Sequence, residues 1–157
     1  MTQSEKIAKY EEILPQIEAI VSGVEYGISS LANISAMIHR NFNFFWTGFY
    51  VLSGDSLLLG PFQGDPACLK ISKGKGVCGA ACTQERTMVV EDVDKFPGHI
   101  ACSSLSRSEI VVPVFSNAGK ITAVLDIDSD KLATFDEIDK QYLEKVVACL
   151  KVYDSFV

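Results

Sequence analysis

Apolar residues recur at helical spacing in two stretches near the amino terminus. The first stretch covers about residues 4–22 and places its apolar side chains on one face of a helix. Pro15 lies inside this stretch and should kink or split the helix, because proline has no N–H to donate. After the break at Gly23, a second helical pattern extends from Tyr26 to about Arg40. We expect both helices to form a packing layer.

The period changes to that of β-strands after the second helix. Two runs rich in aromatic residues and leucine, 43–52 and 56–64, are separated by the turn signal Gly54-Asp55. This pattern predicts a β-hairpin.

Further strand and helix signals follow in alternation. Thr134, with Glu137 three residues later, is typical of a capping box at the start of the last helix. The later elements are a short helix over 76–82, a strand over 87–90, two strands over 109–115 and 120–127 joined by the turn 116–119, and a helix from Thr134 to about Tyr153. This order predicts an α+β fold with a mostly antiparallel central sheet and helices packed on it.

The length and composition fit one domain. The chain has 157 residues, of which 48% are hydrophobic, so a single domain over 1–157 is expected, with an N-terminal helix over about 4–22 and a core over about 24–153. We expect no membrane span and no signal peptide, and therefore a cytoplasmic protein. The net charge of -6 argues against binding to nucleic acid or to anionic membranes.

One face of the first predicted strand combines aromatic rings with a glycine. Trp46, Gly48 and Tyr50 alternate and therefore share a face. A glycine between two large rings predicts a hollow that suits a small ligand. The alternative is that the rings simply fill the core.

The chain has five cysteines, and three of them lie in polar or glycine-rich connections: Cys68, Cys78 and Cys102. Cys82 and Cys149 fit structural positions in helices. An odd number of cysteines in a reducing compartment makes a structural disulfide framework improbable. Three loop thiols on one small sheet can instead supply a nucleophile and a second thiol that resolves its sulfenic acid.

A zinc site is the other use of the same residues. Cys68, Cys78, His99 and Cys102 would supply four ligands, although the Cys-x-x-Cys spacing of structural zinc sites is absent. His99 could instead be a catalytic base or an inert loop residue.

Three carboxylates fall on what should be neighbouring strands near the Cys102 loop. These are Glu109, Asp126 and Asp128, and the last two alternate, so they point to one face. Converging acids can bind a cationic amino group, or one of them can act as an acid if burial raises its pKa. The alternative is that the two aspartates are solvated residues at the end of a strand.

Five motifs together resemble the free methionine-(R)-sulfoxide reductases, which are single-domain enzymes of the GAF fold. The spacing of Cys68, Cys78 and Cys102 also matches that family, and the similarity extends from about residue 20 to the last helix. The motifs are Asn43–Tyr50 (NFFWTGFY), Gly74–Gly79 (GKGVCG), Pro97–Cys102 (PGHIAC), Ser106–Pro113 (SRSEIVVP) and Val124–Ser129 (VLDIDS).

The resemblance implies roles for the thiols and for one acid. Cys102 matches the nucleophile that attacks the sulfoxide sulfur, and Cys68 matches the resolving cysteine that forms a disulfide with it. Cys78 matches a third thiol that can take part in disulfide exchange. Glu109 matches the acid that binds or protonates the sulfoxide oxygen.

It also implies a substrate site and a partner. Asp126 and Asp128 match carboxylates that hold the amino group of the substrate, and Trp46 and Tyr50 match aromatic residues that line the pocket. The implied reaction reduces free L-methionine-(R)-sulfoxide and counters oxidative damage to free methionine. No bound cofactor or metal is implied, because thioredoxin, reduced by NADPH through thioredoxin reductase, would reset the disulfide.

Two other classes of protein stay open at this point. One is a GAF module that binds a ligand or senses redox state without turnover. The other is a zinc-stabilised binding protein. A homodimer through the N-terminal helices is a further expectation.

Overall fold

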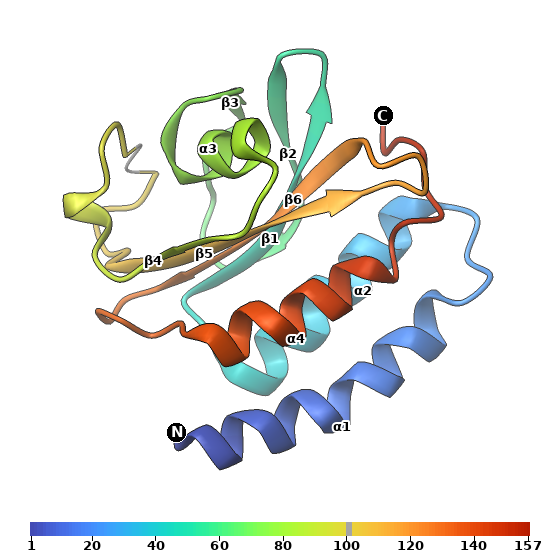
Figure 1. Cartoon of the computed structure of the whole chain (residues 1–157), viewed down its shortest axis with the longest axis horizontal. Coiled ribbons are helices and arrows are strands. Elements are labelled where there is room, and N and C mark those ends of the chain that lie inside the picture. The colour runs from blue at the N-terminus through green and yellow to red at the C-terminus, as the bar shows by residue number, and fades with distance from the viewer. Residues whose placement is uncertain (100–101) are drawn as a thin grey trace.

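The computed structural model, which describes residues 1–99 and 102–157, has one β-sheet with helices on both faces (Figure 1). The helices are α1 (Gln3–Val21), α2 (Gly27–Phe42), α3 (Gly76–Gln84), the short 3-10 helix η1 (Val93–Lys95) and α4 (Glu137–Ala148). The strands are β1 (Trp46–Ser53), β2 (Ser56–Gln63), β3 (Lys70–Ser72), β4 (Met88–Val90), β5 (Ser108–Phe115) and β6 (Ile121–Ser129). The predicted α+β class is confirmed.

The six strands follow the order β3-β2-β1-β6-β5-β4, and every neighbouring pair is antiparallel. The two predicted hairpins are present as β1–β2 and β5–β6. The pairing of β1 with β6 joins them at the centre of the sheet. The three strands that carry the predicted site residues are therefore adjacent.

One face of the sheet is covered by α2 and α4, and α1 packs against these two helices as an outer layer (Figure 1). Alternate residues of the strands, such as Phe49, Ile110 and Leu125, are fully buried beneath these helices. The packing layer predicted for the N-terminal helices is confirmed. Within the described ranges no helix has both the length and the apolar character needed to cross a membrane.

The opposite face holds a smaller second core beneath α3. Trp46, Tyr50 and Val111 contribute to it from the strands, and Val77 and Cys78 contribute from the helix. Polar residues enter this layer as well, so the candidate site lies on this face.

Pro15 does not split the first helix. α1 is continuous over its 19 residues, with Pro15 inside it. Pro15 and Glu11, whose carbonyl loses its helical N–H partner, both lie on the exposed side of the helix, where that carbonyl is open to solvent. Ile13 and Ile17, which flank the proline, are buried and hold both halves against the core. The predicted split of the helix is therefore wrong.

The start of the last helix also differs from the prediction. Its N-cap is Asp136, whose side chain accepts a hydrogen bond from the backbone N–H of Asp139, while the Asp139 carboxylate accepts one from the backbone N–H of Asp136. This is a capping box two residues further on than the predicted one. The hydroxyl of Thr134 instead forms a 2.6 Å hydrogen bond with that of Ser129.

Two short elements carry no clear signal in the sequence. β3 has only three residues, and η1 is a single turn. The first strand also begins three residues later than predicted, because Asn43 adopts a left-handed conformation that ends α2.

Candidate active site

A cavity of about 60 Å³ lies on the α3 face of the sheet, between α3, the central strands and two loops. Almost all the predicted site residues line it: Trp46, Tyr50, Cys78, Cys102, Glu109, Asp126 and Asp128. Cys68 does not line the cavity itself but is bonded to Cys102, which does. Residues from distant parts of the chain therefore meet at one site.

The strand register explains why the carboxylates converge. Asp128 of β6 lies directly opposite Trp46 of β1 on one side and Glu109 of β5 on the other. Two positions along, Asp126 lies opposite Gly48. Directly opposite residues in an antiparallel pair have Cβ atoms about 4.5–5.5 Å apart. The prediction that Asp126 and Asp128 share a face is confirmed, since both reach the cavity.

These acids are withdrawn from water. Glu109 and Asp126 are each only 6% exposed, and Asp128 is half-buried. Burial raises the pKa of Glu109, and the neighbouring Asp126 and Asp128 raise it further. Burial likewise raises the pKa of Asp128, followed by the effect of Asp126, while the Ser106 hydroxyl opposes the rise by donating a 2.9 Å hydrogen bond.

Asp126 has an acceptor without a donor. Burial raises the pKa of its carboxyl group, and Oδ1 is buried with no hydrogen-bond partner among the described residues. A buried acceptor in this state favours a ligand that donates to it. The alternative that Asp126 is a solvated strand-end residue is therefore wrong.

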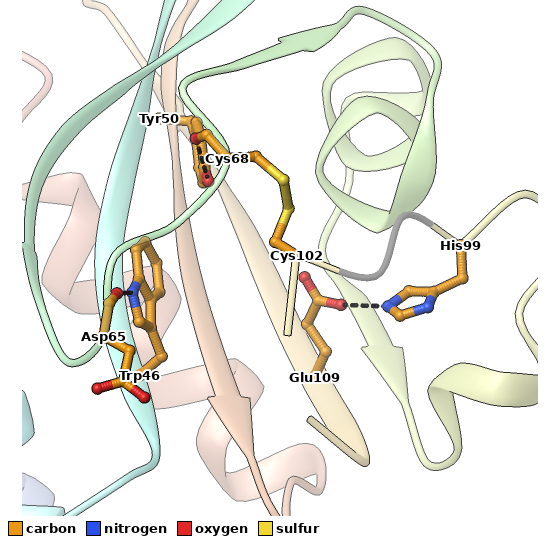
Figure 2. Close-up of a disulfide and its surroundings, with 7 residues drawn as sticks. All are labelled: Trp46, Tyr50, Asp65, Cys68, His99, Cys102 and Glu109. Atoms are coloured by element: carbon orange, nitrogen blue, oxygen red, sulfur yellow. Dashed lines mark hydrogen bonds and ion pairs between the residues drawn. A yellow bond between two sulfur atoms is a disulfide. The ribbon is translucent and has the colours of Figure 1, made fainter. Parts of the chain in front are cut away.

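His99 is a further titratable residue beside Glu109 (Figure 2). Its Nε2 lies 3.9 Å from Oε2 of Glu109. Burial lowers the pKa of His99, although Asp94 opposes this effect, and the pKa of Glu109 is raised. Both shifts favour the neutral forms of the two groups and therefore oppose an ion pair between them.

A disulfide joins Cys68 and Cys102, with the two Cα atoms 5.5 Å apart (Figure 2). Cys68 lies on the connection between β2 and β3, and Cys102 lies on the connection that leads into β5. The bond therefore ties two loops together beside the cavity. It also removes two of the four ligands of the alternative zinc set, so that set cannot bind zinc in this form.

Two aromatic residues of β1 hold the Cys68 loop in place (Figure 2). The Tyr50 hydroxyl donates a 2.9 Å hydrogen bond to the Cys68 carbonyl. The Trp46 indole Nε1–H donates a 3.0 Å bond to the Asp65 carbonyl. Burial, followed by the charge of Asp126, raises the pKa of Tyr50, so its hydroxyl remains a donor.

The hollow predicted at Gly48 is absent. A Cβ atom on Gly48 would lie 2.6 Å from Cη2 of Trp46 and would also clash with Phe62. The Trp46 ring stacks on Phe62 with centroids 5.3 Å apart and covers the glycine. Aromatic core filling, the alternative, is therefore correct at this position, and the cavity lies beyond the ring.

Cys78 is the third thiol at the site. It lies in the first turn of α3 and is 4% exposed. Its Sγ and one carboxylate oxygen each from Glu109 and Asp126 lie within 4.8 Å of one another. Burial, then Asp126 and Glu109, raises the pKa of this thiol, which is therefore neutral.

The other two cysteines lie in packed surroundings. Cys82 is a buried residue of α3 and contributes to the second core, and Cys149 packs against the core on the helical side of the sheet. Sequence reasoning did not single out Ser106, which is buried and orients Asp128. Its place just before β5, among other serines, gave no distinguishing signal.

The fold and the site define the class of the protein: the chain belongs to the GAF-domain family, whose model matches residues 34–148. It is 52% identical over 151 residues to GAF domain-containing protein A of Dictyostelium discoideum, covering 96% of this chain and 95% of that protein. It is 44% identical over 148 residues to the free methionine-R-sulfoxide reductase of Saccharomyces cerevisiae, covering 87% and 82%.

A solved structure agrees with these relatives. The X-ray structure of free methionine-R-sulfoxide reductase from Neisseria meningitidis, in complex with its substrate, has a TM-score of 0.91 and 50% identity. The match covers 96% of this chain and 91% of that one. The chain therefore belongs to the free methionine-R-sulfoxide reductase family and is an oxidoreductase.

Proposed function

We propose that this protein reduces free L-methionine-(R)-sulfoxide to L-methionine and so counters oxidative damage to free methionine. Relatives that carry the name of this activity support the proposal. The observation that carries it is the position of the Cys68–Cys102 disulfide, which adjoins a cavity lined by three acids, two of them buried. An oxidisable thiol and a protonated acid are the two groups that sulfoxide reduction requires.

The first step in this proposal reduces the sulfoxide. The Cys102 thiolate attacks the sulfoxide sulfur, and the oxygen is transferred to the cysteine sulfur with a proton supplied by Glu109. The thiol and the sulfoxide become a sulfenic acid on Cys102 and methionine, so two electrons pass to the substrate. The raised pKa of Glu109 keeps the proton available near neutral pH.

The second step closes the disulfide. The Cys68 thiol attacks the sulfenic sulfur of Cys102, the new S–S bond forms, and water leaves. Cys78, held as a neutral thiol, is a poorer attacking group than a thiolate. We assign resolution to Cys68 for this reason. A dithiol such as thioredoxin then reduces the disulfide, using electrons from NADPH through thioredoxin reductase, so no bound cofactor is required.

Two aspartates and two rings would hold the substrate. Asp126 and Asp128 would accept hydrogen bonds from the substrate ammonium group, and the unpartnered Oδ1 of Asp126 is available for one of them. Trp46 and Tyr50 form an apolar wall for the thioether end. A protein-bound methionine sulfoxide has no free ammonium group, so this arrangement selects the free amino acid.

A coupled assay tests the proposal. The protein is mixed with thioredoxin, thioredoxin reductase, NADPH and free L-methionine-(R)-sulfoxide, and NADPH oxidation and methionine formation are both measured. Methionine should accumulate in step with NADPH consumption, and the Cys102→Ser variant should be inactive. Absence of methionine formation with either thioredoxin or dithiothreitol would refute the activity and would favour a ligand-binding GAF module instead.

We further propose a cytoplasmic homodimer formed through the N-terminal helices. Ile20 at the end of α1 and Tyr26 before α2 are 36% and 68% exposed, which supports an interface there. Sedimentation of the Tyr26→Ser variant tests this: the variant should be monomeric where the unchanged protein is dimeric.

A further inference from the structure

Two large apolar side chains lie in water beside the disulfide. Leu69, directly after Cys68, is 77% exposed, more than any other large apolar residue that the structure describes. Leu105, three residues after Cys102, is 60% exposed. Three residues span at most about 10–11 Å, so covalent geometry alone keeps both leucines close to the two sulfurs.

Both leucines lie on backbone that is hydrogen-bonded. The Leu69 carbonyl accepts a 3.0 Å hydrogen bond from the N–H of Leu59 in β2. The N–H of Leu105 donates a 3.2 Å bond to the hydroxyl of Ser103. Large apolar side chains exposed beside a reactive bond offer apolar contacts to a protein that must reach that bond.

The same two loops carry positive charge on a negative protein. The segment 64–75 contains three lysines and one aspartate, a net charge of +2, and the segment 102–108 adds Arg107. The whole chain has a net charge of -6. We name Leu69, Lys70, Leu105 and Arg107, which are all exposed, the redox rim.

We propose that the redox rim is the docking surface for the protein dithiol that reduces the Cys68–Cys102 disulfide. The proposal rests on the proposed function. The fitting partner carries an apolar patch beside its thiol pair and acidic residues around that patch. The leucines would enter the apolar patch, and Lys70 and Arg107 would attract the acids and speed the encounter.

The exchange balances in two steps. A thiolate of the partner attacks one sulfur of the disulfide, the Cys68–Cys102 bond breaks, and the other sulfur leaves as a thiolate that takes up a proton. The partner's second thiol, as a thiolate, then attacks the mixed disulfide and releases the first sulfur. The partner ends as a disulfide, and Cys68 and Cys102 end as thiols.

The experiment compares two reductants on one set of variants. The double variant Leu69→Ser/Leu105→Ser is assayed with an acidic thioredoxin and, separately, with dithiothreitol, a small neutral dithiol that needs no docking surface. Val152→Ser is the matched control, because Val152 is also 60% exposed but follows α4, which covers the other face of the sheet. We expect kcat/KM for thioredoxin to fall about tenfold in the double variant and to stay within about twofold in the control.

The dithiothreitol arm separates docking from folding and chemistry. Dithiothreitol-supported turnover of the double variant should stay within about twofold of the unchanged protein. An equal loss with both reductants, or no loss with thioredoxin, would overturn the proposal. A change in sedimentation of the double variant would also overturn it, since the rim would then join copies of this chain. Failure of the unchanged protein with both reductants would instead refute the proposed function.

A charge variant tests the same surface without removing apolar groups. In Lys70→Glu/Arg107→Glu, KM for thioredoxin should rise about tenfold at low salt. Between about 50 and about 300 mM salt, KM of the unchanged protein for thioredoxin should rise, while that of the variant should rise less. A salt dependence that is identical in both proteins would contradict a role for these charges.

Discussion

Glu109 and Asp128 lie directly opposite one another on β5 and β6, on the face of the sheet that bounds the cavity. Like charges at directly opposite positions destabilise a sheet. Burial raises the pKa of both carboxyl groups, and the nearby Asp126 raises both further, which favours protonated forms and so reduces this cost. The sheet register therefore favours a protonated Glu109, which its proposed role as proton donor requires.

The first prediction is that Glu109→Gln lowers kcat at least about 100-fold, because an amide keeps the shape of the acid but cannot give up a proton in the same way. The measurement is methionine formation with dithiothreitol as reductant, which excludes effects on thioredoxin. Substrate KM should change much less than kcat. A variant with nearly full kcat would show that another group protonates the oxygen.

The same substitution should change how stability depends on pH. The pKa of Glu109 is higher in the folded chain than in the unfolded one, so its favourable contribution is complete at low pH and is lost as pH rises through the folded pKa. The free energy of unfolding in urea should therefore fall as pH rises above about 4.3, the pKa of an unfolded glutamate, and it should fall less in Glu109→Gln. Parallel curves for the two proteins would contradict the buried, protonated acid.

Replacement of Cys68 is predicted to lower the steady-state rate much more than replacement of Cys78. Cys68→Ser should lower the thioredoxin-dependent rate about tenfold or more, because the sulfenic acid on Cys102 loses its bonded partner. Cys78→Ser should retain the rate within about threefold, because Cys78 is buried as a neutral thiol. Mass spectrometry after one turnover checks the cause: a trapped sulfenic acid should appear on Cys102 in the first variant. The reverse ranking of the two variants would assign resolution to Cys78.

Gly64, at the start of the loop that carries Cys68, is predicted to be required for the stability of the fold. It has φ +124°, and a Cβ there would lie 2.7 Å from Cδ1 of Trp46. Gly64→Ala should therefore cost more than about 2 kcal/mol of unfolding free energy, through backbone strain and displacement of the ring. Gly119→Ala is the matched control, since Gly119 has φ +78° but no neighbour within 4 Å. The control should cost about 1 kcal/mol in the same urea titration. Equal costs would mean that the contact with Trp46 is unimportant.

The packing of α1 against α4 depends on one buried carboxylate, that of Asp139, which is 0% exposed. The Lys6 ammonium donates to it over 2.6 Å, and the Tyr10 hydroxyl donates over 2.7 Å. Lys6→Met should cost about 2–3 kcal/mol of unfolding free energy, because it leaves a buried charge without its cation. Glu11→Gln, which alters the exposed contact between α1 and Tyr142, should cost less than about 0.5 kcal/mol. Similar costs for the two variants would show that burial of Asp139 does not matter.

The periodic segments and the strand-borne site residues were predictable from the sequence. Asp126 and Asp128 alternate within a strand, so their common face follows from the geometry of any β-strand. Their approach to Glu109 also needed the β5–β6 hairpin, which the turn residues 116–119 indicate. These arguments use only local chain geometry, which the sequence encodes directly.

Long-range packing was not predictable in the same way. The predicted hollow at Gly48 is absent because the Trp46 ring, which stacks on Phe62 of the neighbouring strand, lies over the glycine. Pro15 fails to break α1 because the solvent side of the helix tolerates the lost hydrogen bond. The rotation of the Trp46 ring depends on a side chain from another strand, and the spacing of residues within one strand does not contain that information.

The Cys68–Cys102 bond encloses a loop with a sequence separation of 34 residues that crosses from the β2–β3 connection to the entry of β5. Closing a loop of this size removes unfolded-state entropy worth about 4 kcal/mol. Under the proposed mechanism, the oxidised protein is then the more heat-resistant form, and each reduction returns it to a less stable but catalytically active form. When reductant is scarce, the proposed cycle would leave the protein in its oxidised form, which resists heat better than the reduced form. Turnover would start again once a dithiol reduces the disulfide.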